Sequence, residues 1–281
     1  MNNPKRGSIT LLAGAMLLAS SAAFANVEPA TKPVTIGKEL QQAKTYTVTS
    51  APTAPLELAK PTLPDTSGYT AEAIAAKVVR TKAGKISVRR MMQENALKDF
   101  IGGDNKMAEW VVRQHGIPQA IFIDDGYMNL KDLAKKVPKQ YFSETSPGVY
   151  LAKLPIVVGN KGILEIDKQT QELRLSQEAG SFLVNDGQLF VRDTKITGWS
   201  EKANGPAAFK SPKEFRPFLL SWGGTETYIA NSKIASFGYA NSKSYGVSIS
   251  QYTPNMAKVL KRPEPTGWIV GSEFSDMWYG F

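Results

Sequence analysis

The chain has 281 residues, of which 42% are hydrophobic and 21% are charged, so it can fold around one large core or two smaller ones. It contains no cysteine and one histidine, which excludes disulfide scaffolds, iron–sulfur clusters, thiolate zinc sites, cysteine nucleophiles and histidine-rich metal sites. The net charge of +9 favours a polyanionic partner, which could be a nucleic acid, an anionic membrane or an acidic polysaccharide.

The first 25 residues contain the parts of a secretory signal peptide in the right order. Lys5 and Arg6 form a basic region, residues 9–19 form an apolar region too short to span a bilayer, and Ala23-Phe24-Ala25 is a cleavage signal. No later segment is apolar enough for a membrane span. We therefore predict a periplasmic protein, cut after Ala25, that meets an acidic glycan and no nucleic acid.

Residues 26–68 are predicted to form an extended leader, because prolines interrupt the segment repeatedly. Residues 69–147 are predicted to form a small helical or mixed domain. A buried strand is expected at 120–123, followed by a turn at Asp124-Asp125-Gly126. Four helices are expected, each begun by an N-cap side chain: Thr70, Ser87, Asp104 and Asn129.

From 148 to 281 the pattern changes to short apolar segments separated by Gly, Asn, Ser and Asp. Candidate strands lie at 163–166, 172–175, 182–184 and 189–191. Three segments share one form, namely an apolar residue, any residue, a turn-former, Ser or Thr, a charge and an apolar residue: 191–196, 229–234 and 269–274. Their spacings of 38 and 40 residues predict successive turns of a solenoid with inserted loops at 201–217 and 253–265.

The physical interpretation is a mainly β fold, a parallel β-helix whose coils each bury an apolar face against their neighbours. The alternative is a β-sandwich in which the repeats are coincidental. A second repeat relates 241–247 to 275–281, and both copies end in Tyr-Gly-apolar. Because the chain stops where the next strand should begin, we expect it to be the N-terminal part of a longer protein, with only the first coils of the β-helix.

Long stretches of the chain resemble the periplasmic mannuronan C5-epimerases of alginate-producing pseudomonads. The stretches that carry the resemblance are 63–65, 68–70, 90–94, 99–106, 221–227 and 237–246. The resemblance implies a right-handed parallel β-helix and the conversion of β-D-mannuronate to α-L-guluronate in polymeric alginate. It also implies periplasmic alginate export and polymerisation proteins as partners, and no metal or other cofactor.

The family's catalytic Asp-Pro-His-Asp run and its carboxylate-neutralising arginine have no counterpart here. We therefore assign no catalytic residue, expect the catalytic coil beyond Phe281, and expect this fragment to be inactive alone. His115 is better explained as a helix C-terminal residue, and Asp124-Asp125 as part of a turn.

The expected strand that follows Tyr245 is in register, by the Tyr-Gly repeat, with the family's catalytic strand two coils away. Alternation along this strand points Val247 inward and Ser248 outward. We predict that Ser248, Ser250, Tyr252 and Lys243 contact sugars at distal subsites; the alternative is an ordinary solvated face. Lys195 and Lys233 occupy equivalent repeat positions and form either a cationic ladder for uronates or a solvated edge.

Two other functions stay open. A polyuronate lyase shares the first half of the epimerase reaction, proton removal beside a neutralised carboxylate, and then eliminates the 4-O bond. A glycan-binding or scaffold component of the export complex would bind alginate without turnover.

Overall fold

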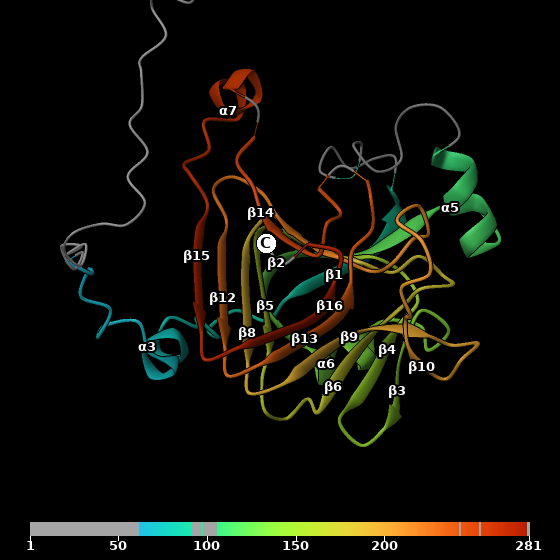
Figure 1. Cartoon of the computed structure of the whole chain (residues 1–281), viewed down its shortest axis with the longest axis horizontal. Helices are drawn as coiled ribbons and strands as arrows, with labels where there is room; N and C mark the ends of the chain where they lie inside the picture. The colour runs from blue at the N-terminus through green and yellow to red at the C-terminus, as the bar shows by residue number, and fades with distance from the viewer. Residues whose placement is uncertain (1–61, 92–96, 98–105, 242, 253, 280–281) are drawn as a thin grey trace, which may run out of the picture. The chain divides into compact units, whose positions relative to one another are not determined.

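A computed structural model describes residues 62–91, 97, 106–241, 243–252 and 254–279 (Figure 1). Residues Leu63–Phe281 form one compact unit. The predicted signal peptide and all but the last residues of the predicted leader lie outside the described residues.

Two sheets make up most of the described chain. The first has nine strands: β1 (Lys85–Arg90), β2 (Gln119–Asn129), β5 (Ile156–Ile166), β7 (Leu183–Asn185), β8 (Gln188–Arg192), β11 (Leu219–Ser221), β12 (Glu226–Ala230), β14 (Val247–Ile249) and β15 (Thr266–Val270). The second has seven: β3 (Phe142–Ser146), β4 (Val149–Ala152), β6 (Glu172–Ser176), β9 (Lys195–Ser200), β10 (Gly205–Pro206), β13 (Lys233–Phe237) and β16 (Glu273–Met277). The helices within the described residues are α3 (Ala71–Ala76), α5 (Lys106–Gln114), α6 (Leu130–Lys136) and α7 (Pro254–Leu260).

Successive strands wind around one axis. One coil consists of β7, β8 and β9, the next of β11, β12 and β13, and the following one of β14, β15 and β16. Each strand pairs in parallel with the equivalent strand one coil away, so that strands of different coils lie side by side (Figure 1). This arrangement is the predicted parallel β-helix. These strands do not form the two packed antiparallel sheets that a β-sandwich requires.

The sequence repeats correspond to the register of the coils. Ile229 lies between Val191 and Ile269 in adjacent strands, and Lys233 pairs in register with Lys195. The predicted alignment of 191–196, 229–234 and 269–274 is therefore confirmed. The shared form follows from the stacking, because equivalent positions of neighbouring coils meet the same surroundings.

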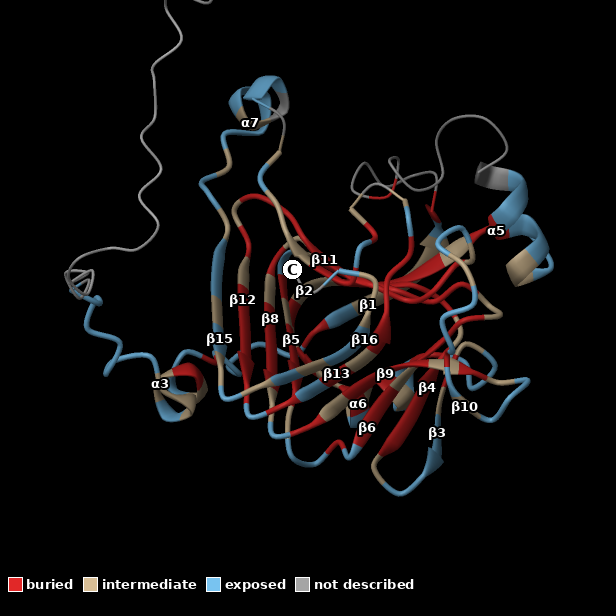
Figure 2. Cartoon of the chain, in the orientation of Figure 1, coloured by how far each residue is buried: buried red, intermediate tan, exposed pale blue. Residues whose placement is uncertain are grey.

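Side chains inside the coils make the main core. Val247 is 1% exposed and stacks with Leu219 and Leu183, which are fully buried and in register with it. A second cluster covers the outer face of the same strands and includes Trp110 of α5 and Leu220. Figure 2 shows the buried residues concentrated along strands such as β8, β12 and β4, with exposed ones in the loops, in α5 and α7, and along β15 of the last described coil.

Two predicted helix starts are confirmed. The Thr70 hydroxyl accepts a hydrogen bond from the Ala73 amide at 3.1 Å, and the Asn129 side chain accepts one from the Asp132 amide at 2.8 Å. Each bond satisfies an amide that the first turn of a helix leaves unpaired. A helix also forms at Lys106–Gln114, whose predicted cap Asp104 lies outside the described residues.

The predicted helix after Ser87 is wrong, since Ser87 lies within β1. Ile86 and Val88 pack against the interior cluster, so the alternation of this segment reports a strand that pairs antiparallel with β2. The predicted turn at 124–126 is also wrong, because these residues continue β2. A local register shift between Ile123 and Asp125 accommodates them within the sheet.

One sheet joins strands from both sides of residue 147, the domain boundary predicted from the sequence. β2 pairs in parallel with β5 from Ile121 to Asn129, and the side chains of Ile121 and Leu164 belong to one interior cluster. The helix that begins after Thr70 is short and ends at Ala76.

A buried ion cluster fastens the segment after α3 to the β-helix. The Glu165 side chain is fully buried and accepts hydrogen bonds from Arg80 at 2.6 and 2.9 Å, from Tyr127 at 2.7 Å and from Arg192 at 2.6 Å. Burial favours the neutral acid, but these hydrogen bonds favour the carboxylate more strongly, so the pKa of Glu165 is lowered.

Candidate functional site

The four predicted sugar contacts lie on or next to β14. Val247 points into the core, and Ser248 is in register with Leu220, whose side chain belongs to the outer cluster. Ser248 therefore points outward as predicted. Ser248 and Ser250 line a cavity of about 290 Å³ together with Tyr245, Val247, Ile249 and Ile269. Because Val247 points into the core and Ile269 is in register with the buried Ile229, this cavity includes inward-facing positions of the last described coil and is not confined to the outer surface of β14.

An aromatic and cationic group adjoins this surface. The ring of Tyr252 lies parallel to the ring of Trp222, with an interplanar angle of 3° and centroids 5.2 Å apart. The Lys243 ammonium lies 3.8 Å from the centroid of the Trp222 ring. Trp222 thus brings together two of the predicted contacts, Tyr252 and Lys243, which are nine residues apart in the chain.

The Tyr252 hydroxyl is held from the turn between β7 and β8. It donates a hydrogen bond to Asp186 at 3.0 Å, and Arg262 donates to the same carboxylate at 3.1 Å and to the Asp186 carbonyl at 2.7 Å. Asp186 also lines a cavity of about 210 Å³ with Arg89 and Phe122. The guanidinium of Arg89 lies 3.7 Å from the centre of the Phe122 ring, so a second cation–aromatic pair lies beside this cavity.

Such a surface suits an acidic sugar chain. A flat aromatic ring can pack against the apolar face of a pyranose, a lysine or arginine can pair with a uronate carboxylate, and serine hydroxyls can bond to sugar hydroxyls. Trp222, Asp186, Arg262 and Arg89 were not predicted as site residues. The Ser-Trp-Gly-Gly sequence around Trp222 was the available signal, since paired glycines allow other chain segments to approach a ring closely.

The second candidate cation row, Lys195 and Lys233, lies on the other sheet. The two lysines are in register, as the repeat predicted, but each has an acidic partner: Lys195 contacts Glu172 at 3.1 Å and Lys233 contacts Glu273 at 2.9 Å. These glutamates reduce the positive charge that the row offers to a uronate.

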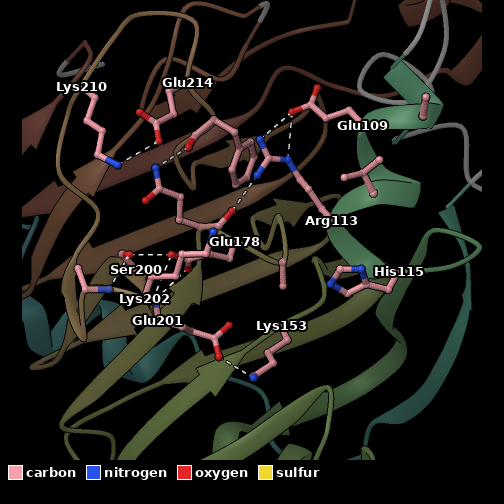
Figure 3. Close-up of a pocket in the computed structure, with 16 residues that line it drawn as sticks. Glu109, Arg113, His115, Lys153, Glu178, Ser200, Glu201, Lys202, Lys210 and Glu214 are labelled. Atoms are coloured by element: carbon pink, nitrogen blue, oxygen red, sulfur yellow. Dashed lines mark hydrogen bonds and ion pairs between the residues drawn. The ribbon is translucent and has the colours of Figure 1, made fainter.

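A cavity of about 1050 Å³ lies between α5 and the loop after β9 (Figure 3). Three of its cations are paired with lining glutamates: Arg113 with Glu109 at 2.9 Å, Lys153 with Glu201, and Lys210 with Glu214 at 3.6 Å; the fourth, Lys202, is matched in charge by Glu178. The opposite charges offset one another, which gives little attraction for a polyanion. His115 also lines this cavity, at the end of α5 and with a φ of 52°, in agreement with its predicted helix-terminal place.

Within the described residues, no group of three or more His, Asp or Glu side chains is placed to hold a metal ion. The described helices are all too short or too polar to cross a bilayer.

Known proteins similar to this chain share one activity in their names. The mannuronan C5-epimerase of Pseudomonas fluorescens is 82% identical over 281 residues, which are 99% of this chain and 53% of that protein. The mannuronan C5-epimerase AlgG of Azotobacter vinelandii is 56% identical over 238 residues, 85% of this chain and 45% of that protein. The chain is a close relative of the mannuronan C5-epimerases. No protein-family model matches it.

The fold of the epimerases has been determined. A crystal structure of the periplasmic alginate epimerase AlgG superposes with a TM-score of 0.77 and 68% identity, covering 80% of this chain and 53% of that one. This relative confirms the predicted β-helix and the predicted periplasmic location. The chain spans about half the length of the epimerases it matches.

Proposed function

We propose that this chain is the part of a periplasmic mannuronan C5-epimerase that binds the polymer beside the reacting residue. The observation that carries the proposal is the meeting of Tyr252 and Lys243 on the Trp222 ring, beside the outward-facing Ser248 of β14. The similarity to the epimerases over nearly the whole chain supplies the reaction, conversion of β-D-mannuronate to α-L-guluronate in polymeric alginate.

The reaction defines what the polymer-binding part must do. C5 epimerisation removes a proton beside a carboxylate and returns one to the opposite face, so the sugar chain must be held in fixed register with the base and the acid. Contacts several sugars away can provide that register at no chemical cost to the reacting residue. In this proposal Lys243 pairs with a uronate carboxylate, and Ser248 and Ser250 bond sugar hydroxyls.

Binding is the first test of the proposal. Titration of mannuronate oligomers into the chain, followed calorimetrically, should show binding that weakens in Lys243→Ala and in the double variant Ser248→Ala, Ser250→Ala. A neutral glucan of similar length should not bind. Lys258→Ala is the matched control, because Lys258 is an exposed lysine on α7, away from the Trp222 ring. Equal affinity of all variants for the uronate oligomers would contradict the proposed site.

Turnover distinguishes the competing activities. We expect no new guluronate signals in the proton NMR spectrum of polymannuronate incubated with this chain alone, because no residue matches the family's Asp-Pro-His-Asp run. A longer protein that contains this chain should produce them. An unsaturated, ultraviolet-absorbing product would instead indicate a lyase, and binding without any change in the polymer would indicate a scaffold. Association with the proteins of alginate export and polymerisation is part of the same proposal.

A further inference from the structure

The inserted segment between β14 and β15 is fastened to the coil beneath it. The segment leaves β14 at Ile249, forms α7 and returns at Thr266. At its two ends lie Tyr252, stacked on Trp222, and Arg262, bonded to Asp186. The side chains of Asp186 and Arg262 are only 21% and 20% exposed, so this ion pair is largely shielded from water.

A pair of glycines makes room for this attachment. The position that a Cβ atom of Gly223 would occupy is filled by the Gln251 side chain and lies 3.1 Å from the Tyr252 ring. A Cβ atom of Gly224 would lie 2.5 Å from the Nε atom of Arg262, and the φ of Gly224 is +76°. A larger residue at either position would have to displace the Gln251 or Arg262 side chain, both of which take part in this attachment.

The two ends of the insert are also linked to each other. The Gln251 side-chain amide donates to the Pro263 carbonyl at 3.2 Å, and its oxygen accepts from the Tyr252 amide at 2.8 Å. Tyr252 and Arg262 then meet on one carboxylate, that of Asp186, which belongs to a coil two turns earlier. The orientation of the Tyr252 ring therefore depends on contacts made by residues remote in the sequence.

We propose that Asp186 and Arg262 are positioning residues, which hold the insert against the Gly223-Gly224 turn and so keep the Tyr252 ring parallel to Trp222. That this surface binds a uronate chain rests on the proposed function. That Asp186 and Arg262 hold the Tyr252 ring is independent of the proposed function. Neither residue needs to touch the sugar, since both act through Tyr252. Sugar affinity should therefore depend on Asp186 and Arg262 only while Tyr252 is present.

The ring orientation can be measured without a ligand. Two stacked aromatic rings in fixed geometry contribute to the near-ultraviolet circular dichroism spectrum. Subtracting the spectrum of Trp222→Phe from that of the wild type gives the part of the signal that depends on Trp222. We expect Arg262→Ala and Asp186→Ala to lose most of this part while the far-ultraviolet spectrum stays unchanged. Arg262→Lys should restore much of it, because a lysine can still pair with Asp186. Lys258→Ala should leave it intact.

The sugar affinity gives the second measurement. Arg262→Ala and Asp186→Ala should each weaken the binding of mannuronate oligomers by about tenfold, the size of one charge-assisted hydrogen bond. The double variant should lose no more than either single one, because the two residues act as a unit. In a Tyr252→Ala background, Arg262→Ala should have no further effect.

The two measurements separate the two proposals. If the wild-type chain binds no mannuronate oligomer, the proposed function fails, and the circular dichroism still decides whether Asp186 and Arg262 position the ring. If Arg262→Ala and Asp186→Ala keep the Trp222-dependent spectrum, the positioning proposal is overturned, whatever the sugar affinity. If both variants lose this spectrum but bind the oligomers as the wild type does, the ring is held as proposed, and the role of Tyr252 in sugar binding is contradicted.

Discussion

The ring of Tyr252 lies parallel to that of Trp222, although 29 residues and one full coil of the β-helix separate them in the chain. Trp222 is 2% exposed, so its ring supports the Tyr252 ring from beneath. The Lys243 ammonium also lies on the Trp222 ring, 3.8 Å from its centroid. We attribute the binding of an acidic sugar chain to the aromatic rings together with the Lys243 charge. Substituting a ring and removing the charge should have different effects.

Trp222→Phe should weaken the binding of mannuronate oligomers while the chain stays folded, because phenylalanine keeps part of the ring support. Trp222→Ala should in addition lower the free energy of unfolding by about 3–5 kcal/mol, the usual cost of removing a buried tryptophan. Calorimetric binding and urea denaturation of the same samples measure the two effects. Unaltered affinity in a folded Trp222→Phe variant would contradict the role given to the ring.

Lys243→Gln should weaken binding most at low ionic strength. A lysine near the surface attracts a carboxylate through a field that salt screens over about 8–10 Å at physiological concentrations. The difference in affinity between wild type and Lys243→Gln should therefore shrink as sodium chloride is added. A difference that does not change with salt would mean that Lys243 acts by packing on Trp222 and not by its charge.

Glu165→Gln should lower the free energy of unfolding by about 3–5 kcal/mol, because it leaves the largely shielded Arg192 and the half-exposed Arg80 without their acidic partner. Urea denaturation at neutral pH measures this loss. Glu264→Gln is the control, since Glu264 is exposed. A loss no larger than that of the control would show that the cluster contributes little to stability.

Glu165 should also make stability depend on pH. The pKa of Glu165 in the folded protein is lowered from its ordinary value of 4.5, so its contribution is complete above 4.5 and is lost as the pH falls through the lower, folded value. Glu172 has a lowered pKa as well, since hydrogen bonds from Thr197, Arg174 and Lys195 outweigh the effect of burial. Stability measured between pH 7 and 3 should therefore fall in acid, and less steeply in Glu165→Gln than in wild type. An equal loss of stability in acid in the wild type and in Glu165→Gln would rule out this contribution of Glu165.

Ile229→Ala should lower the free energy of unfolding by about 2–5 kcal/mol. Ile229 is fully buried in the middle of its stack, between residues of the coils before and after it, so truncation leaves a cavity that neither neighbour can fill. Val259→Ala, at a side chain that is 80% exposed on α7, should change stability little. Equal effects of the two substitutions would argue against a stacked interior at Ile229.

The sequence predicted the coils well because each coil repeats one set of contacts. An apolar residue at Val191 returns at Ile229 and Ile269 because the three positions are in register on neighbouring coils; Val191 and Ile229 are fully buried, and Ile269, on the last described coil, is 37% exposed. The helix caps at Thr70 and Asn129 were predictable for a similar reason, as one local hydrogen bond determines each of them.

Features that depend on distant partners were not predictable. Ser87 begins a pattern that also fits a helix, and only the pairing of β1 with β2 selects the strand. Asp124 resembles a turn residue, but Arg89 and Ser87 hold its carboxylate within the sheet, at 2.6 and 2.7 Å. Of the candidate site, the outward face of β14 followed from alternation, whereas the Trp222 ring and the Asp186–Arg262 pair come from other coils and loops.

The most direct test of the account is the affinity of mannuronate oligomers for wild type, Lys243→Ala, Tyr252→Ala and the control Lys258→Ala, measured side by side by calorimetry. We predict measurable binding by wild type and Lys258→Ala, and clear losses in the two variants next to Trp222. Binding that is absent in wild type, or identical in all four proteins, would contradict the claim that this face of the β-helix holds the polymer.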